Sequence, residues 1–378
     1  MIIRMSFSFG FTSESFSDDE LNDDIVNVQQ SQSDAQNSLA INPLDDPRLV
    51  SPEVIQPEVL DFSSVVRSLK DVRLTFETLS LFDGQIQLYR RELFDVKHQL
   101  MSESNVEQTT TNENGDPILE ILLGDTAEDV RKNVYEGGLK SWECSIDIIE
   151  LLNNHGKDFS TEQIFDMGCG TALPSTFVFG KYLQSKLDSG LNLILADYNK
   201  SVLELVTLPN LIITWAKTVL TEDEWISLQR SSDENVAIVG DELLLTTILL
   251  QAFMDDLSAR KIKINLISGS WGRVFSNLVR HHVTPTRPLL VFSSETIYQP
   301  ENLPVVAETL LDLYQGDNRT STKALVAAKD IYFGVGGSVI EFESYLRKRL
   351  TESNLPITFD TFKVNSNLKR SIVALQST

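Results

Sequence analysis

The sequence predicts an α/β protein whose open, mainly parallel, doubly wound sheet carries helices on both faces. Seven short apolar runs, rich in Ile, Leu and Val, are typical of strands that are buried on both faces. Stretches with helical periodicity alternate with these runs, as expected of a doubly wound sheet. A glycine-rich turn, residues 168–170, joins the first run to the next helical stretch. In such sheets ligands bind beyond the carboxyl ends of the strands.

The first segment of the chain, residues 1–60, is strongly acidic. It holds eleven acidic residues against Arg4 and Arg48, and Ser, Asn and Gln fill most of the rest. Such a segment cannot bury enough apolar surface to offset the entropy lost on ordering. We therefore predict that residues 1–60 are mostly disordered.

Residues 61–117 are predicted to be an extension and linker that packs on the core. The stretches 63–79 and 88–101 contain enough apolar and aromatic residues for this packing, although not for a domain of their own. Residues 102–116 are polar and aperiodic, which is typical of an exposed loop.

The remaining residues, 118–378, are predicted to form the main domain. Its strands are expected at residues 163–168, 191–197, 210–216, 263–270, 288–295, 324–333 and 370–376. Its helices are expected at residues 141–152, 174–187, 199–207, 241–259, 273–283, 302–315 and 338–350. The first helix carries its apolar residues on one face, namely Trp142, Ile146, Ile149 and Leu152.

Composition narrows the class of protein. A hydrophobic share of 42% and a charged share of 23% are ordinary for a soluble globular protein. No apolar run reaches the roughly 20 residues needed to cross a bilayer, and acids follow the start too soon for a secretory signal. Only two cysteines, Cys144 and Cys169, are present, and no histidine or cysteine spacing indicates a zinc site. We expect a cytoplasmic or nuclear monomer without a metal ion.

The net charge of −22 bears on the kind of partner. DNA and RNA phosphates would repel such a chain, so we expect no direct contact with nucleic acid. A basic protein would be attracted. The alternative is that the acidity only aids solubility.

The glycine turn has an acidic partner further along the chain. The first strand is expected to end at Asp166, and Gly168 and Gly170 let the backbone turn tightly against a ligand. The next strand ends at Asp197, 31 residues after Asp166. A carboxylate at that place commonly binds the two hydroxyls of a ribose. Asn199 follows as a favoured residue for capping the next helix.

The residues after the turn favour one cofactor over another. A dinucleotide site wants a small residue three positions after its second glycine, and this chain has Leu173 there, followed by Pro174. The pattern D-x-G-x-G-x-A, with Ala172 in third place, fits an S-adenosylmethionine site of class I methyltransferases better than a pyrophosphate site. A nucleotide-dependent oxidoreductase and other α/β folds remain alternatives.

Several longer stretches resemble one family. They are NVYEGGLKSWECSIDIIELL, LADYNKSVL, LISGSWG, SSETIYQPENLP and KDIYFGVGGSVIEFESYL, with MSFSFGF near the start and FKVNSNLKRSI near the end. Together they resemble the protein-histidine N-methyltransferases, above all the fungal members. The resemblance covers residues 60–375 and the first dozen residues. It implies a seven-stranded, Rossmann-like class I methyltransferase sheet. It also implies a histidine of large-subunit ribosomal protein L three as acceptor, and with it a role in ribosome biogenesis or translation.

The resemblance also implies which residues contact S-adenosylmethionine. They lie before the first helix, in the glycine turn and after three strands: Trp142, Glu143, Gly168, Gly170, Asp197, Tyr198, Asn199, Gly269, Ser270, Trp271 and Ser294. Several of them also have ordinary explanations. Trp142 lies on the apolar face of its helix, and a carboxylate such as Glu143 is favoured in a first helical turn anyway.

Methyl transfer to histidine sets modest chemical demands. The imidazole has a reference pKa of about 6.5 and is largely neutral in the cytosol, so no strong base is needed. A partner must hold the proton on the other ring nitrogen and stabilise the growing positive charge. Glu295 and Asp330 are the candidates for this catalytic role. An ordinary hydrogen bond to a neighbouring loop is the alternative explanation for both carboxylates.

Four further residues are candidates for substrate binding. Tyr298 and Tyr332 could form walls around the acceptor ring, and Gly336 and Gly337 could let the loop approach the substrate backbone. A simple turn before the next helix is the alternative for the glycines. Two other functions remain open: a protein-lysine methyltransferase of the same fold, and a non-catalytic module that binds a ribosomal protein.

Overall fold

The computed structural model describes residues 41–52, 54–107, 137–159, 161–185, 187, 189–315, 321–365 and 368–377. All of them belong to one unit, Ile41–Thr378. The disorder predicted for residues 1–40 therefore falls outside the described residues. Of the predicted loop 102–116, residues 102–107 continue a helix, and the rest falls outside the described residues.

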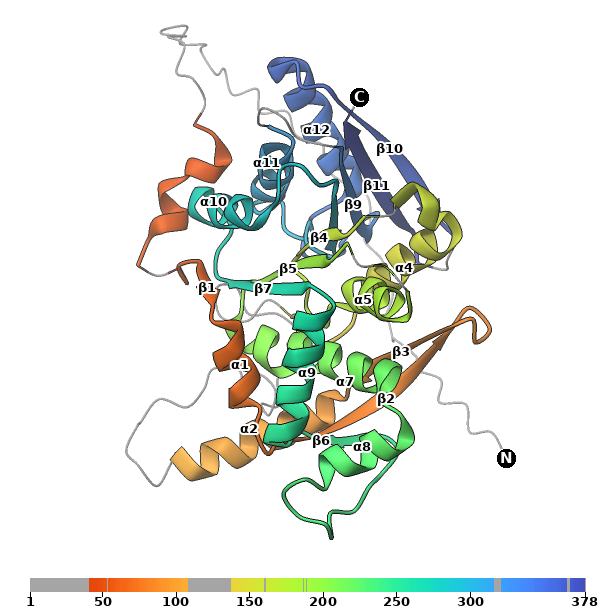
Figure 1. The fold of residues 1–378 in the computed structure, drawn as a ribbon. Coiled ribbons are helices and arrows are strands. Elements are labelled where there is room, and N and C mark those ends of the chain that lie inside the picture. Colours follow the sequence, from red (N-terminus) through yellow and green to blue (C-terminus); the bar gives the residue numbers. More distant parts are fainter. Residues whose placement is uncertain are drawn as a thin grey trace, which may run out of the picture. The chain divides into compact units, whose positions relative to one another are not determined.

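A sheet with the strand order β1-β7-β5-β4-β8-β9-β11-β10 forms the centre of the fold (Figure 1). Its parallel strands are β4 (Gln163–Met167), β5 (Leu191–Asp197), β7 (Ile262–Ser268), β8 (Leu289–Ser294) and β9 (Thr322–Lys329). The antiparallel neighbours at its two ends are β11 (Arg370–Ser377) beside β9, β10 (Ile357–Val364) beside β11, and β1 (Glu58–Leu60) beside β7. Without β1 this is the predicted seven-stranded, doubly wound class I methyltransferase sheet, so the predicted fold class is confirmed.

Side chains of the central strands alternate between two apolar cores, one on each face of the sheet. Ile164 of β4 belongs to one core and Phe165 to the other. Figure 1 shows one face covered by α4 (Glu143–His155), α5 (Leu173–Gln184), α7 (Leu208–Val219) and α9 (Thr247–Ala259), and the other by α10 (Arg273–His282), α11 (Leu303–Leu313) and α12 (Val339–Ser353). Burial on both faces is the reason that these strands read as apolar runs.

The prediction of a strand at residues 210–216 is wrong, because these residues lie in α7. Periodicity cannot separate a short apolar run in a buried helix from a buried strand. The α7 helix is buried nearly all round, and its Trp215 Nε1 donates a hydrogen bond to Asp256 Oδ2 at 2.8 Å. It continues α6 (Lys200–Val202) and a π-helical turn, Leu203–Thr207. The combined stretch Lys200–Val219 is apolar and long enough for a membrane span, but 78% of its most apolar window is buried in this fold.

Two other expectations need correction. The strand β10 was not predicted, because after the buried Ile357 its residues are exposed or only partly buried, and so it lacks a continuous apolar run. The predicted helix 241–259 begins only at Thr247, after the short strand β6 (Glu242–Leu244). Thr246 caps this helix, since its side chain accepts a hydrogen bond from the Leu249 N–H. A polar N-cap of this kind marks the boundary that hydrophobicity alone does not show.

The N-terminal extension packs on the core through a second, smaller sheet. Its order is β3-β2-β6, from β2 (Arg73–Leu81), β3 (Ile86–Arg91) and β6, and the flanking helices are α1 (Phe62–Ser68), α2 (Leu93–Glu107) and α8 (Glu222–Gln229). Arg91 is buried where β3 meets α7. Its backbone N–H donates to Asn210 Oδ1 at 2.8 Å, and its guanidinium contacts Asp95 at 2.6 Å.

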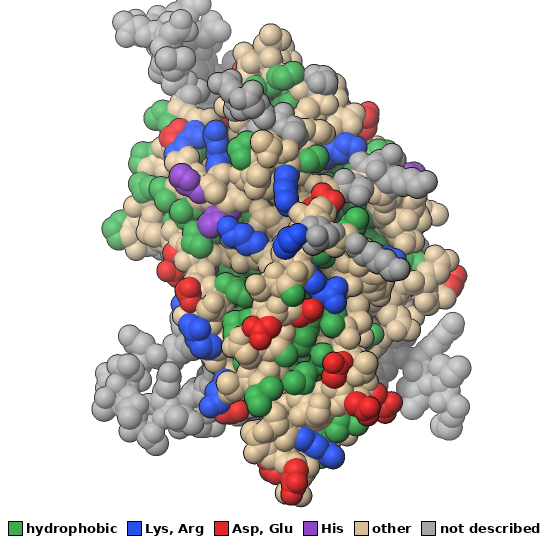
Figure 2. Space-filling model, in the orientation of Figure 1, with side chains coloured by type: hydrophobic (Ala, Val, Ile, Leu, Met, Phe, Trp, Pro, Cys, Tyr) green, Lys and Arg blue, Asp and Glu red, His purple; other side chains and the backbone are tan. Residues whose placement is uncertain are grey.

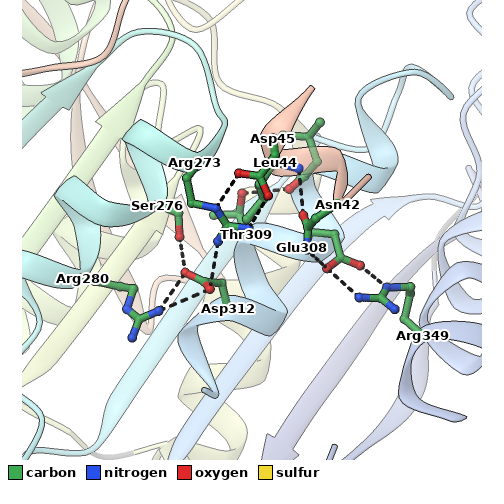
Figure 3. Close-up of polar contacts among 11 residues, drawn as sticks. Asn42, Leu44, Asp45, Arg273, Ser276, Arg280, Glu308, Thr309, Asp312 and Arg349 are labelled. Atoms are coloured by element: carbon green, nitrogen blue, oxygen red, sulfur yellow. Dashed lines mark hydrogen bonds and ion pairs between the residues drawn. The ribbon is translucent and has the colours of Figure 1, made fainter. Parts of the chain in front are cut away.

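Residues 42–52 and 54–60, which composition assigns to the mostly disordered segment, form ordered structure. They comprise two 3-10 turns, Pro43–Asp45 and Pro47–Val50, followed by β1. Asp45 is held by two hydrogen bonds of 2.9 Å from Arg273 of α10, which lower the pKa of this carboxyl (Figure 3). Leu44 is buried beside it. The acidic side chain thus orders the segment by pairing with a base more than 200 positions away.

Two carboxylates of α11 anchor this side of the fold (Figure 3). Asp312 accepts hydrogen bonds from Ser276 at 2.5 Å and from Arg273 and Arg280 at 3.3 Å. Glu308 is 2% exposed and pairs with Arg349 of α12. It also accepts hydrogen bonds from Tyr345 at 2.9 Å and from Asn42 at 3.1 Å, so it connects α11, α12 and the N-terminal segment.

We expect Glu308→Ala to lower the free energy of unfolding by about 3 kcal/mol or more, because it leaves the Arg349 guanidinium without its buried partner. Chemical denaturation measures this change. Glu352→Ala is the matched control: Glu352 also contacts Arg349, at 3.5 Å, but is half exposed, so we expect a loss below about 1 kcal/mol. Equal losses in the two variants would contradict the role given to Glu308.

Candidate active site

A cavity of about 910 Å³ lies beyond the carboxyl ends of the parallel strands. This volume is typical of a small-molecule site, which usually measures about 300–1,000 Å³. Of the predicted residues, those that line it are Trp142, Gly168, Gly170, Asp197, Tyr198, Ser270, Trp271, Ser294, Glu295, Tyr298 and Tyr332. Those that do not line it are Glu143, Asn199, Gly269, Asp330, Gly336 and Gly337.

The glycine turn has the backbone that its sequence predicts. Gly168 and Gly170 have φ of 67° and 51°, the left-handed region that favours glycine. A Cβ on Gly168 would lie 2.7 Å from Thr296 Cγ2, and one on Gly170 would lie 3.0 Å from the Gly138 carbonyl. The turn therefore needs glycine both for its conformation and for the close approach of its neighbours.

Asp197, at the end of β5, forms a hydrogen bond with the glycine turn, residues 168–170. Its Oδ2 accepts a hydrogen bond of 2.9 Å from the Gly170 N–H, and its Oδ1 accepts one of 3.2 Å from the Asn199 N–H. The side chain is buried and also lines the cavity. A carboxylate has about four lone-pair positions, so Asp197 can accept ribose hydroxyls in addition to these backbone donors. Asn199 makes no side-chain cap on the helix that follows, contrary to the prediction.

The residues before α4 differ in part from the predicted helix. The helix begins at Glu143, and its buried face includes Cys144 and Ile148, whereas Ile146 is only partly buried. Trp142 precedes the helix and lines the cavity, with its Nε1 donating to the Gly137 carbonyl at 3.2 Å. Glu143 is exposed, and its carboxylate lies 4.0 Å from Lys329 Nζ. The tryptophan is thus placed for a ligand, while the glutamate does not line the cavity and pairs with Lys329, which does.

Residues 269–271, which follow β7, contact the N-terminal segment and also line part of the cavity. A Cβ on Gly269, whose φ is 110°, would lie 2.5 Å from Pro57 Cα, so this glycine lets the N-terminal segment pass. The Ser270 N–H donates to the Ile55 carbonyl at 2.9 Å. Trp271 lies against Gly168, and its buried Nε1 has no hydrogen-bond partner among the described residues. A buried donor without an acceptor indicates a place where a ligand can bind.

The N-terminal segment supplies a wall of the cavity that sequence reasoning missed. Its contributing residues are Asp46, Arg48, Leu49, Ser51 and Val54. The acidic, polar composition of this segment conceals its two turns, Pro43–Asp45 and Pro47–Val50. The available signals were Asn42-Pro43 and Asp46-Pro47, because each pair places a capping side chain before a proline that opens a turn.

Glu295 follows β8 in a strained conformation. Its φ of 57° is unusual for a residue with a side chain, and such strain clusters at functional sites. Its carboxylate Oε2 accepts a hydrogen bond from the Tyr332 hydroxyl, while Oε1 is buried and has no hydrogen-bond partner among the described residues. Burial, and then the charge of Glu295, raise the pKa of Tyr332 and of the neighbouring Cys144 thiol. Both groups therefore stay protonated beside the carboxylate.

The other catalytic candidate, Asp330, is directed elsewhere. It accepts hydrogen bonds from Ser371 and, at 3.0 Å, from Lys363. Burial acts to raise its pKa, but these hydrogen bonds and the charge of Lys363 together lower it. Asp330 thus has the ordinary structural partners that its alternative explanation requires, and it does not line the cavity.

Tyr298 and Tyr332 meet edge to face, with ring centroids 6.3 Å apart, and both line the cavity. Gly336 and Gly337, the glycines predicted to approach the substrate, do not line the cavity, and Gly337 instead packs against the backbone of Tyr298. The Gly337 N–H donates to the Tyr298 carbonyl at 2.9 Å, and a Cβ on Gly337 would lie 2.2 Å from the Ile297 carbonyl. Gly336 has a φ of 104° within the same turn. Gly337 does allow a close approach, but to the backbone of residues 297 and 298 in the same chain, whereas the prediction was an approach to the substrate backbone.

Behind the glycine turn, Asp166 is fully buried. It accepts a hydrogen bond of 2.6 Å from Ser175, and burial raises its pKa to about 7. In the unfolded chain its pKa is near 3.8. Between these values the folded protein holds a proton that the unfolded chain has released, so this group contributes stability at low pH that is lost as the pH rises toward 7.

We predict that Asp166→Asn removes this pH dependence. Between pH 5 and pH 8, the free energy of unfolding of the natural protein should fall by roughly 2 to 3 kcal/mol relative to the variant. Chemical denaturation of both proteins across this pH range measures the difference between their free energies of unfolding. The contributions of the other titratable groups are the same in both proteins and cancel in this difference. A difference that stays constant with pH would show that Asp166 is ionised in the folded protein.

Comparison with known proteins identifies the family. The chain is 52% identical to histidine protein methyltransferase 1 of Saccharomyces cerevisiae, over 99% of each chain. It is 35% identical to the protein of the same name from Schizosaccharomyces pombe, over 75% of each chain. No protein-family model matches. The O-methyltransferase TomG of Streptomyces achromogenes aligns with a TM-score of 0.35 and 10% identity, over 75% of this chain and 98% of TomG. The chain belongs to the histidine protein methyltransferase family.

Proposed function

We propose that this chain transfers a methyl group from S-adenosylmethionine to a histidine of large-subunit ribosomal protein L three. Its family supports a protein histidine as the acceptor. The observation that carries the chemistry is the buried Glu295 carboxylate, which has one oxygen without a partner among the described residues, in the cavity that also holds the glycine turn.

The residues of the turn fit S-adenosylmethionine, which supplies a methyl group activated on a sulfonium. Gly168 lets the cavity-lining side chains of Thr296 and Trp271 approach the turn closely, and Trp271 offers a buried N–H without an acceptor among the described residues. Asp197 can accept the ribose hydroxyls, as argued above. Trp142 supplies an aromatic wall on the α4 side of the cavity.

Glu295 has the chemistry needed to position a neutral imidazole. Its Oε1, which has no hydrogen-bond partner among the described residues, can accept the hydrogen bond of one ring N–H, and this leaves the lone pair of the other ring nitrogen to act as nucleophile. As the imidazole becomes positively charged, the buried, negative carboxylate stabilises it. The Tyr332 hydroxyl holds Oε2, so the carboxylate keeps its orientation.

The charge of the chain supports a basic substrate. Residues 1–60 alone carry nine of the 22 net negative charges, since they hold eleven acids and two bases. On the face of the fold seen in Figure 2, acidic and basic side chains are interspersed rather than gathered by sign. We propose that the acidic N-terminal residues attract a basic ribosomal protein. Both cysteines are buried and unpaired, which supports action in the cytosol or nucleus.

The substrate assignment is tested with radiolabelled S-adenosylmethionine and unmethylated large-subunit ribosomal proteins. We expect label on protein L three, and mass mapping should place it on a histidine. Asp197→Ala is the control, because it should abolish cofactor binding and labelling together. Label on lysine would contradict histidine specificity, and label on another protein would contradict the proposed substrate.

The role of Glu295 is tested by Glu295→Gln. The amide cannot stabilise the imidazolium charge, so kcat should fall roughly 10²-fold while the Kd for S-adenosylmethionine stays unchanged. Asp330→Asn is the matched control, since Asp330 does not line the cavity. Stopped assays at saturating substrate and calorimetric titration of the cofactor measure the two quantities. A larger loss in Asp330→Asn would assign the role to Asp330 instead.

A further inference from the structure

Three apolar side chains lie where the cavity opens to solvent. Ile331, Phe333 and Val335, in the loop between β9 and α12, are 49%, 82% and 49% exposed. All three line the same cavity as Glu295. We call them the apolar rim. Apolar groups that gather in water beside a cavity are typical of an interaction site.

The backbone of this loop is held in one shape before any substrate arrives. The Tyr332 N–H donates to the Gly337 carbonyl, and the Gly336 N–H donates back to the Tyr332 carbonyl, both at 2.9 Å. Ile331 pairs with Ser338 across the base of the loop. The Tyr332 side chain is buried against Glu295. A loop fixed in this way presents its exposed side chains without a large loss of entropy on binding.

We propose that the apolar rim binds an apolar side chain of the substrate polypeptide, within about three residues of the acceptor histidine. The inference rests on the proposed function, in which that histidine reaches Glu295. The rim lines the same cavity, so a polypeptide whose histidine enters the cavity on the side of this loop passes over it. Tyr332, whose hydroxyl contacts Glu295, lies between Ile331 and Phe333 in the chain, so the rim is close to the acceptor site. Since one extended residue spans about 3.5 Å, the rim is within reach of the histidine's near neighbours in sequence.

The rim thus recognises the sequence around the histidine, whereas Glu295 acts on the ring itself. Phe333 is the main contact, since it is the most exposed side chain of the three and the largest. Aromatic residues at the centre of an interface commonly contribute most of the binding energy. The neighbouring Gly334, with a φ of 80° and open space around its Cβ position, leaves room for the incoming chain.

The test compares Phe333→Ser, Phe333→Leu and the control Phe362→Ser. Phe362 is 46% exposed on β10 and does not line the cavity. With recombinant protein L three as substrate, Phe333→Ser should raise KM about tenfold, with kcat within twofold. The Kd for S-adenosylmethionine and the free energy of unfolding should not change. Phe333→Leu should restore most of the affinity, and Phe362→Ser should match the natural protein.

A second arm replaces each apolar neighbour of the acceptor histidine in protein L three by serine. One replacement should raise KM for the natural enzyme but have little further effect on Phe333→Ser, as expected of two residues in contact. An unchanged KM in Phe333→Ser would overturn the inference while leaving histidine methylation intact. Self-association that is lost in Phe333→Ser would assign the rim to a second copy of this chain instead. Absence of histidine labelling by the natural enzyme would refute the proposed function and the rim together.

Discussion

The backbone of the glycine turn, residues 168–170, is the constraint on which the site depends. Its left-handed glycines are crowded by Gly138 and Thr296, and its polar groups are bound by residues from distant segments. Asp197 of β5 accepts the Gly170 N–H, and Thr207 of the π-helical turn donates to the Gly170 carbonyl at 2.6 Å. The cofactor site is therefore positioned by hydrogen bonds to the main chain. A shift of this turn would move the ends of several elements at once.

Strand burial decides which parts of the fold could be predicted from the sequence. The parallel strands bury both faces, so their apolar runs and the switch to helical periodicity predicted the fold class. The same signal misassigned residues 210–216, because these residues of the α7 helix are all buried and form an equally continuous apolar run. The strand β10 is half exposed and left no run to recognise. A continuous apolar run indicates that the residues are buried, but it does not by itself show whether they form a strand or a helix.

The residues of the site can likewise be divided into those that the sequence predicts and those that it does not. Asp197 and Glu295 were predicted because they follow strands, where the fold class places ligands, and Trp271 was implied by the family resemblance; all three line the cavity. The N-terminal wall could not be predicted, since its order depends on the distant Arg273 and on the room left by Gly269. The role of a glycine motif was also ambiguous, because it too depends on which distant segment of the chain lies beside the glycine. A glycine that admits a ligand and one that admits another stretch of the chain look alike in sequence.

Tyr332 connects the chemical step with recognition of the substrate. Its hydroxyl fixes the Glu295 carboxylate, while its backbone closes the loop that carries the apolar rim. Because its side chain is buried and Phe333 is exposed, adjacent residues have separate tasks. A change at Tyr332 alters the orientation of the carboxylate and the shape of the loop together. A change at Phe333 alters only the surface that the substrate meets, so the preferred sequence around the histidine can vary while the geometry of methyl transfer is kept.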